Sequence, residues 1–282
     1  MSDDQNSKTP KDSHYARLRR AHRDRTQQKQ GDGKSDSRRS EGPRDGLVRL
    51  YGLHTVRAAL DNPQRRIKHM RVTRNAAARL ELGEPSALPF PVEIVEPRAI
   101  DGLTGPDAVH QGVLIEAEPL KPRPLGDLEG AGLVLVLDQV TDPHNVGAIM
   151  RSAVAFGVNA LVTTARHSPS ESGVLAKAAS GALEHIDHLT VRNLAEALEE
   201  LSAAGFQTIG LDSDGPAQLE ATFAADRIAL VLGAEGKGLR QKTRDTVTAL
   251  ARLDMPGAIR SLNVSNAAAV SLYAARQYLG SR

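Results

Sequence analysis

The sequence of 282 residues contains no cysteine and no tryptophan, and it has only four phenylalanines and four tyrosines. The absence of cysteine excludes disulfides, thiolate metal sites and cysteine nucleophiles. Few aromatic side chains are available to stack on bases, which is a common way to read single-stranded RNA. A nucleic-acid partner would therefore have to be bound through charge, backbone contacts and shape.

Long apolar runs are also missing from the sequence. None approaches the roughly 18 consecutive apolar residues that a membrane span needs. The N-terminus shows no apolar signal region, and the acidic residues Asp3 and Asp4 argue against an organelle transit peptide. We therefore expect a cytoplasmic protein.

The net charge of +2 conceals an uneven distribution. Residues 1–45 carry 12 Lys and Arg against 8 Asp and Glu, whereas the remainder carries 24 against 26. Because residues 1–45 contain almost no aliphatic side chains, they cannot bury enough apolar surface to offset their chain entropy. We predict a disordered basic tail, which could be a phosphate-binding arm or a solubilising segment.

Residues 46–122 show a small α/β pattern. Strands are expected at 47–52, 67–72, 92–95 and 113–115, with a short helix at 55–60. The stretch Lys121-Pro122-Arg123-Pro124 is typical of an extended linker, because proline restricts both itself and its predecessor. A domain boundary is therefore predicted near residues 120–128.

Residues 130–282 alternate between strand and helix patterns. The apolar runs 133–137 and 228–232 are typical of strands buried on both faces. This alternation predicts an α/β fold with a mostly parallel sheet and helices on both faces. The other strands are expected at 160–163, 208–211 and 250–253, and helices at 146–156, 194–204 and 264–279.

Three polar loops follow strands of this predicted sheet, where parallel α/β folds bind their ligands. In the first loop, Asn145 is placed to cap the helix that carries Arg151. The second loop, 233–238, has three glycines around Glu235 but lacks the spacing of a phosphate loop. The third, 255–266, has more donors and acceptors than a helix cap needs. Each loop could also be an ordinary turn or cap, and together they predict a site without naming a reaction.

The three loops resemble the motifs of the SpoU, or TrmH-like, family of RNA ribose 2′-O-methyltransferases. The residues that carry the resemblance are Asp142 to Ala153, Leu232 to Leu239, and Met255-Pro256-Gly257 through Ser261 to Ser265. Residues 47–120 are similar to the family's substrate-binding domain, which itself resembles ribosomal protein L30. Within the family, the resemblance is greatest to enzymes that modify a guanosine of large-subunit ribosomal RNA.

The resemblance implies a parallel α/β fold whose C-terminal part forms a trefoil knot, and a homodimer that acts on RNA. S-adenosylmethionine would be the methyl donor, with no metal. It would be bound at Gly233, Leu253, Met255 and Leu262. The implied catalytic residues are Asn145, Arg151, Glu235, Ser261 and Asn263.

Arg151 would, by the same resemblance, bind an RNA phosphate and favour the developing alkoxide. A role as general base is the alternative, but a guanidinium rarely loses its proton. The resemblance leaves two other functions open, the same reaction on transfer RNA and a non-catalytic ribosome-assembly factor. The joint presence of all five polar residues argues against the second. A nucleotide hydrolase is disfavoured because a phosphate-loop lysine and acidic metal-ligand clusters are missing.

Overall fold

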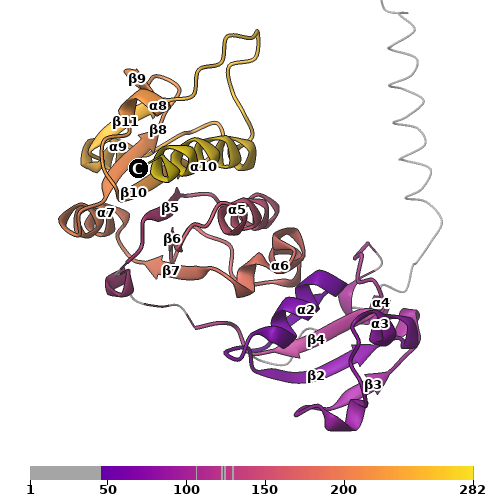
Figure 1. Cartoon of the computed structure of the whole chain (residues 1–282). Coiled ribbons are helices and arrows are strands. Elements are labelled where there is room, and N and C mark those ends of the chain that lie inside the picture. Colours follow the sequence, from indigo (N-terminus) through magenta and orange to yellow (C-terminus); the bar gives the residue numbers. More distant parts are fainter. Residues whose placement is uncertain (1–45, 106, 122, 124, 129, 282) are drawn as a thin grey trace, which may run out of the picture. The chain divides into compact units, whose positions relative to one another are not determined.

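The structure, a computed structural model, describes residues 46–281 except 106, 122, 124 and 129. The basic tail predicted for residues 1–45 lies outside the described residues. The elements form two sheets, one of four strands and one of seven (Figure 1). We call them the N-terminal and the C-terminal sheet.

The N-terminal sheet has the strand order β1-β4-β2-β3. Strand β4 runs antiparallel to both β1 and β2, whereas β3 is parallel to β2. The apolar side chains of Leu50, Met70 and Ile115 are fully buried and form the centre of its core. The elements are β1 Val48–Tyr51, α2 Leu53–Asp61, β2 Ile67–Val72, α3 Arg74–Arg79, η1 Pro85–Ala87, β3 Val92–Ile94, α4 Pro97–Thr104 and β4 Val113–Ala117.

The C-terminal sheet is parallel throughout and has the strand order β7-β6-β5-β10-β8-β11-β9. The prediction of a parallel α/β fold is thus confirmed. The strands are β5 Leu133–Asp138, β6 Ala160–Thr164, β7 Asp187–Val191, β8 Gln207–Leu211, β9 Ala217–Gln218, β10 Ile228–Gly233 and β11 Ala249–Arg252. The helices are η2 Leu125–Asp127, α5 Pro143–Ala155, α6 Gly173–Ala179, η3 Ala182–Glu184, α7 Leu194–Ala203, α8 Leu219–Thr222, α9 Gln241–Thr246 and α10 Val264–Gly280.

Strand β5 shows why its apolar run is unbroken. Leu133, Leu135 and Leu137 belong to one buried cluster, whereas Val134 and Val136 belong to a second cluster on the other face. Alternate side chains of a strand point to opposite faces, so both faces of β5 must be apolar. Each fully buried side chain of this kind contributes about 1.5–3 kcal/mol to folding.

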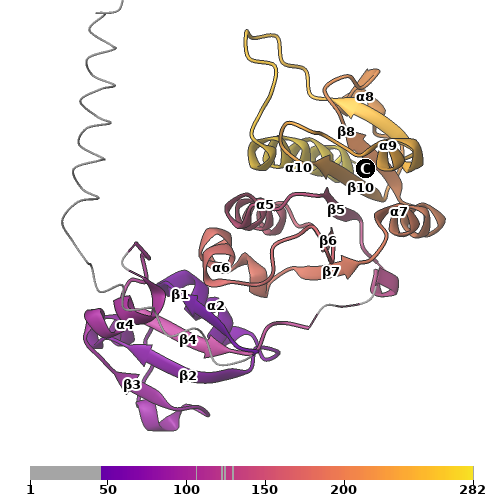
Figure 2. The same cartoon turned by 180° about the vertical axis from the view of Figure 1, so that it is seen from behind.

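Helices cover both faces of the C-terminal sheet. Helix α5 packs against α6 and α10, and α7 packs against α9. The first group lies on one side of the sheet and the second on the other (Figures 1 and 2). A Cβ atom on Gly147 would lie 2.5 Å from the Cβ of Ala178, so the glycine permits the close approach of α5 to α6.

The N-terminal cap of α5 corrects the prediction that Asn145 caps this helix. The helix begins at Pro143, and the Asp142 side chain accepts a hydrogen bond from the backbone N–H of His144 over 3.1 Å. Proline suits the first helical position because its missing N–H has no intrahelical partner there. Asn145 therefore lies within the first turn, and its amide remains available for other contacts.

A buried ion-pair network lies where the two sheets are joined by a shared apolar cluster. The Arg65 guanidinium is fully buried and contacts Glu184 at 2.6 Å and Glu171 at 2.5 Å. The backbone carbonyl of Glu118 accepts a further hydrogen bond from Arg65 at 3.0 Å. Burial raises the pKa of the Glu171 carboxyl, an effect that the nearby Arg65 charge opposes.

Candidate active site

The candidate site lies at the carboxyl ends of β5 and β10, which are neighbours in the sheet. In the strand order, β6 and β7 lie beyond β5 on one side, whereas β8, β11 and β9 lie beyond β10 on the other. Such a reversal of strand order opens a crevice for ligands in parallel α/β folds. The loop after β10 carries Glu235, and Asn145 lies in the first turn of α5, directly after the loop that follows β5.

A buried aspartate fixes these two loops to each other. Asp138, at the end of β5, is fully buried and accepts hydrogen bonds from the backbone N–H of Arg240 at 3.0 Å and from its Nε at 2.6 Å. Charge-assisted hydrogen bonds of this kind are stronger than neutral ones. No sequence motif predicts this pair, and its one signal in the sequence is a polar residue at the end of an apolar run.

Glu235 is the centre of a polar cluster. Its Oε1 accepts hydrogen bonds from Nδ2 of Asn263 at 2.6 Å, from Nδ2 of Asn145 at 3.3 Å and from the backbone N–H of Val264 at 3.3 Å. The Asn263 amide also donates to Oδ1 of Asn145 at 3.0 Å. Three predicted catalytic residues from three separate parts of the chain are thus in direct contact.

The cluster lies at the N-terminus of helix α10. Oδ1 of Asn263 accepts hydrogen bonds from the backbone N–H of Ser265 at 2.9 Å and from its hydroxyl at 2.5 Å, so Asn263 caps the helix. The positive end of the helix dipole favours the negative charge of the Glu235 carboxylate. The sequence of the third loop therefore determines both where α10 begins and how Glu235 is held.

A cavity of about 300 Å³ adjoins Glu235. It is lined by all four residues predicted to bind the methyl donor, Gly233, Leu253, Met255 and Leu262, and by Ser261. Most of its side chains are apolar or absent. A Cβ atom on Gly233 would lie 2.1 Å from the carbonyl carbon of Gly238, so the loop can close here only with glycine. The lining suits a ligand held through main-chain groups.

Unlike the other four predicted catalytic residues, Arg151 lies neither in the Glu235 cluster nor on the wall of the adjoining cavity. Six helical positions separate it from Asn145, and at about 100° per residue the two point in different directions. Arg151 is exposed and lines another cavity of about 360 Å³ with His54, Arg57 and His185. Within one chain, the predicted catalytic set is therefore divided between two places.

Metal ligands are not grouped in the described part of the chain. Within residues 46–281, no set of three or more His, Cys, Asp or Glu side chains could hold a metal ion. In the same residues, no helix is long and apolar enough to cross a membrane.

The chain matches two protein-family models. Residues 132–273 match the sequence model described as the SpoU rRNA Methylase family. Residues 49–123 match the model described as RNA 2'-O ribose methyltransferase substrate binding. The first match covers the C-terminal sheet, and the second covers the N-terminal sheet.

The sequence is also similar to individual curated proteins. It is 38% identical over 234 residues to the 23S rRNA (guanosine-2'-O-)-methyltransferase RlmB of Ralstonia nicotianae, covering 80% of this chain and 94% of that protein. The RlmB of Pseudomonas putida is 35% identical over 239 residues, covering 81% and 96%. An AdoMet-bound rRNA methyltransferase from Sinorhizobium meliloti has a similar fold, with a TM-score of 0.70, 26% identity and coverage of 83% and 88%.

Proposed function

The chain belongs to the SpoU rRNA methylase family, and we propose that it transfers a methyl group from S-adenosylmethionine to the ribose 2′-oxygen of a guanosine in large-subunit ribosomal RNA. The observation that carries the proposal is the contact of Glu235 with Asn145 and Asn263 beside an apolar cavity. The RlmB relatives act on this class of RNA, and their similarity covers nearly their whole length.

The methyl donor would occupy the cavity lined by Gly233, Leu253, Met255 and Leu262. When bound, it supplies a methyl group already activated by the adjacent sulfonium charge, so the proposed reaction uses no metal. The glycine loop allows close approach of main-chain groups to the donor, and the leucine and methionine side chains exclude water from it.

The polar cluster would position the acceptor. Glu235 and the two asparagine amides offer fixed acceptors and donors to the ribose hydroxyls, and Ser261 adds a hydroxyl on the cavity wall. Holding two reactants in line accounts for a large part of the barrier reduction in such reactions. We assign to Arg151 the electrostatic role, binding an RNA phosphate and favouring negative charge on the 2′-oxygen.

We propose that the active enzyme is a homodimer in which Arg151 of one copy completes the site of the other. Within one chain Arg151 lines a cavity apart from the Glu235 cluster, so a second copy could supply it. Helix α10, which begins at that cluster, exposes large apolar side chains: Val270 is 48% exposed and Tyr273 is 56% exposed. Exposed apolar side chains on one helix are suited to an interface.

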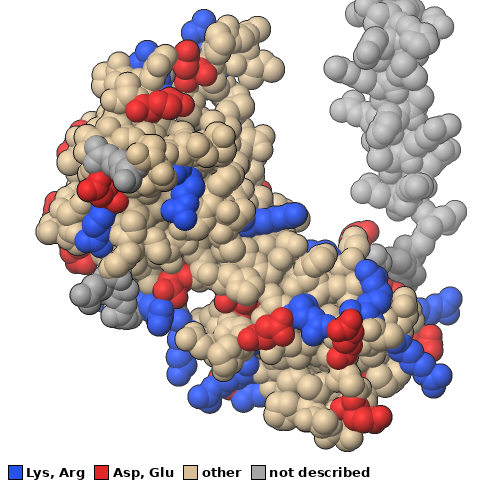
Figure 3. All heavy atoms as spheres, viewed as in Figure 1, with Lys and Arg blue, Asp and Glu red and all other residues tan. Residues whose placement is uncertain are grey.

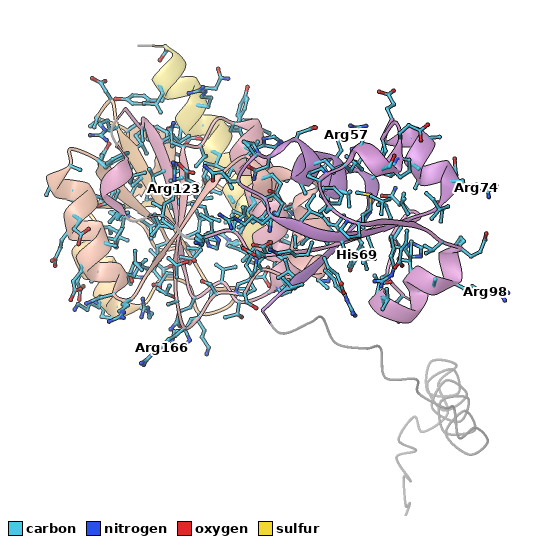
Figure 4. The ribbon with its side chains drawn as sticks, turned by 90° about the horizontal axis from the view of Figure 1, so that it is seen from below. Arg57, His69, Arg74, Arg98, Arg123 and Arg166 are labelled. Atoms are coloured by element: carbon cyan, nitrogen blue, oxygen red, sulfur yellow. The ribbon has the colours of Figure 1, made fainter. Side chains whose placement is uncertain are left out.

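We assign residues 46–122 to an L30-like RNA substrate-binding domain and residues 130–282 to the methyltransferase domain. The domain-model match to substrate binding supports the first assignment. On the face drawn in Figure 3, basic and acidic side chains are interspersed over the N-terminal sheet. Arg74 and Arg98 point outward from α3 and α4 in Figure 4, where they could contact phosphates.

Two further proposals come from the family resemblance. The C-terminal part would form a trefoil knot, a proposal that rests on the match of residues 132–273 to the SpoU family. The protein would act on ribosomal RNA in the cytoplasm. An experimental structure would test the knot, and localisation of a tagged chain would test the cytoplasmic location.

The deciding experiment is methyl transfer from labelled S-adenosylmethionine to total RNA from a strain that lacks the protein, followed by mapping of ribose methylation. We expect label at one guanosine of large-subunit RNA. Label in transfer RNA would instead assign the same reaction to another substrate. Absence of label together with absence of donor binding would favour an assembly factor and overturn the proposal.

A further inference from the structure

Besides the donor cavity, a second cavity borders the polar cluster, and its volume is about 450 Å³. Asn145 lines it, and Ala234 and Glu235 line both cavities. The loop after β5 contributes Gln139 to Asp142, the loop after β6 contributes His167, and the loop after β10 contributes Lys237. These side chains have no part in the donor site described above.

The two cavities differ in chemistry. The donor cavity is lined mainly by apolar residues and glycine, whereas the second presents amide, hydroxyl, carboxylate, imidazole and ammonium groups. A group transfer is accelerated when its two substrates are held side by side next to the catalytic groups. Glu235 lines both cavities, so its cluster lies next to both.

We propose that the second cavity binds the acceptor nucleotide, and that His167 and Lys237 are positioning residues that hold the phosphates flanking the methylated ribose. This inference rests on the proposed methyl transfer to RNA. The ribose would lie at Asn145 and Glu235, and the base would contact the loop after β5. The His167 imidazole and the Lys237 ammonium group would donate hydrogen bonds to the RNA phosphates.

The size and the accessibility of the cavity agree with this assignment. Its volume lies within the roughly 300–1,000 Å³ of small-molecule sites, enough for one nucleoside. His167 and Lys237 are exposed, so RNA can reach them without a change in the protein. The neighbouring Arg166 extends away from the sheet in Figure 4 and adds positive charge to the same loop. Exposed polar side chains usually face only water, but His167 and Lys237 line the cavity that borders the catalytic cluster.

The conformation of Gln139 adds an independent observation. Its φ of 61° lies in the left-handed region, which is uncommon for a residue with a side chain. Non-glycine residues in this region cost free energy and are concentrated at binding and catalytic sites. The preceding residue, Asp138, accepts two hydrogen bonds from Arg240, and these hold the backbone in place next to Gln139.

The test uses the full-length enzyme with the variants His167→Ala, Lys237→Ala and the double variant. The matched controls are His144→Ala and Lys242→Ala, exposed residues of the same types that line neither cavity. Steady-state methylation of ribosomal RNA gives kcat and KM for RNA, and calorimetry gives the dissociation constant for S-adenosylmethionine.

We expect KM for RNA to rise about tenfold for each single variant, the effect of losing one charge-assisted hydrogen bond. The double variant should have a larger KM, while kcat at saturating RNA and donor affinity stay at wild-type values. For Lys237→Ala the slope of log affinity against log salt concentration should decrease by about 0.7–0.9, as for one lost phosphate contact. The controls should behave as wild type.

An unchanged KM for RNA in the double variant would overturn the inference, as would an equal rise in the two controls. Loss of donor affinity would also overturn it, because the residues would then act on the first cavity. A wild-type enzyme that methylates no RNA would instead contradict the proposed function, so the two failures are distinguishable.

Discussion

The side-chain amide of Asn263 donates a hydrogen bond to Glu235 over 2.6 Å, and its carbonyl oxygen accepts one from the backbone N–H of Ser265 over 2.9 Å. One side chain thus serves the catalytic cluster and the start of helix α10. Substitution should separate these two contributions.

For Asn263→Ala we expect loss of about 1 kcal/mol of stability, the usual cost of removing an N-cap. Methyl transfer should decrease about 100-fold, as when one preorganised hydrogen-bond donor is removed from an active site. The matched control is Asn193→Ala, which removes the cap of α7, where the Asn193 side chain accepts from the backbone N–H of Ala195 at 3.1 Å. It should lose similar stability in chemical denaturation but keep its activity; equal loss of activity in both would show that Asn263 acts only through stability.

Mixing of inactive subunits tests the proposed origin of Arg151. Arg151→Ala and Glu235→Ala homodimers should each be inactive, and the exposed Arg151→Ala should keep its stability to within about 0.5 kcal/mol. Coexpressed, differently tagged subunits should form heterodimers with about half of wild-type activity, because one of the two sites of a C2 dimer is then intact. Inactive heterodimers would show that Arg151 serves its own chain, and an active Arg151→Ala homodimer would exclude its catalytic role.

Gly233→Ala should weaken donor binding. The added Cβ would lie 2.1 Å from the carbonyl carbon of Gly238, a backbone atom that cannot yield without moving the loop. We expect a destabilisation of about 1–3 kcal/mol, as for overpacking in a filled core, and at least a tenfold rise in the dissociation constant for S-adenosylmethionine, about 1.4 kcal/mol. Gly257→Ala is the control, since a Cβ there meets nothing within 4 Å. Wild-type donor affinity in Gly233→Ala would exclude close contact with this loop.

His188 should make stability depend on pH. Burial lowers the pKa of its imidazole below the ordinary 6.5, so the folded state releases a proton that the unfolded state still binds. The associated stability is present above pH 6.5 and is lost as pH falls through the lower folded pKa, with a slope of at most about 1.4 kcal/mol per pH unit. His188→Gln removes this titration and can still hydrogen-bond to the Thr163 hydroxyl, which lies 2.9 Å from Nε2 of His188. Urea midpoints between pH 5 and 7.5 should therefore vary less in the variant; an unchanged profile would contradict the assignment.

The elements that could be predicted from the sequence are those with a strong local pattern. The apolar runs of β5 and β10 and the long α10 were found at nearly their observed bounds. Strand β7 was missed because it lies at the sheet edge and contains the polar residues Asp187, His188 and Thr190. The predicted start of α5 is three residues late because Asn145 and Asp142 are both suitable caps, and Asp142 is the one that caps the helix.

The candidate site was predictable only in part. The three loops were recognised as polar ends of strands, but Asn145 and Glu235 are 90 positions apart in the chain, and local patterns do not encode such contacts. The family resemblance supplied the choice of residues. It did not indicate that Arg151 points away from the cluster, because that depends on the angular position of each residue around α5.

The two hydrogen-bonding ends of Asn263 limit which residues could replace it over evolutionary time. Aspartate and serine are interchangeable with asparagine at most helix starts. Here an aspartate would set a second carboxylate against Glu235, and a serine side chain has no amide to reach that carboxylate while its oxygen caps the helix. The beginning of α10 can therefore not drift in sequence independently of the chemistry beside it.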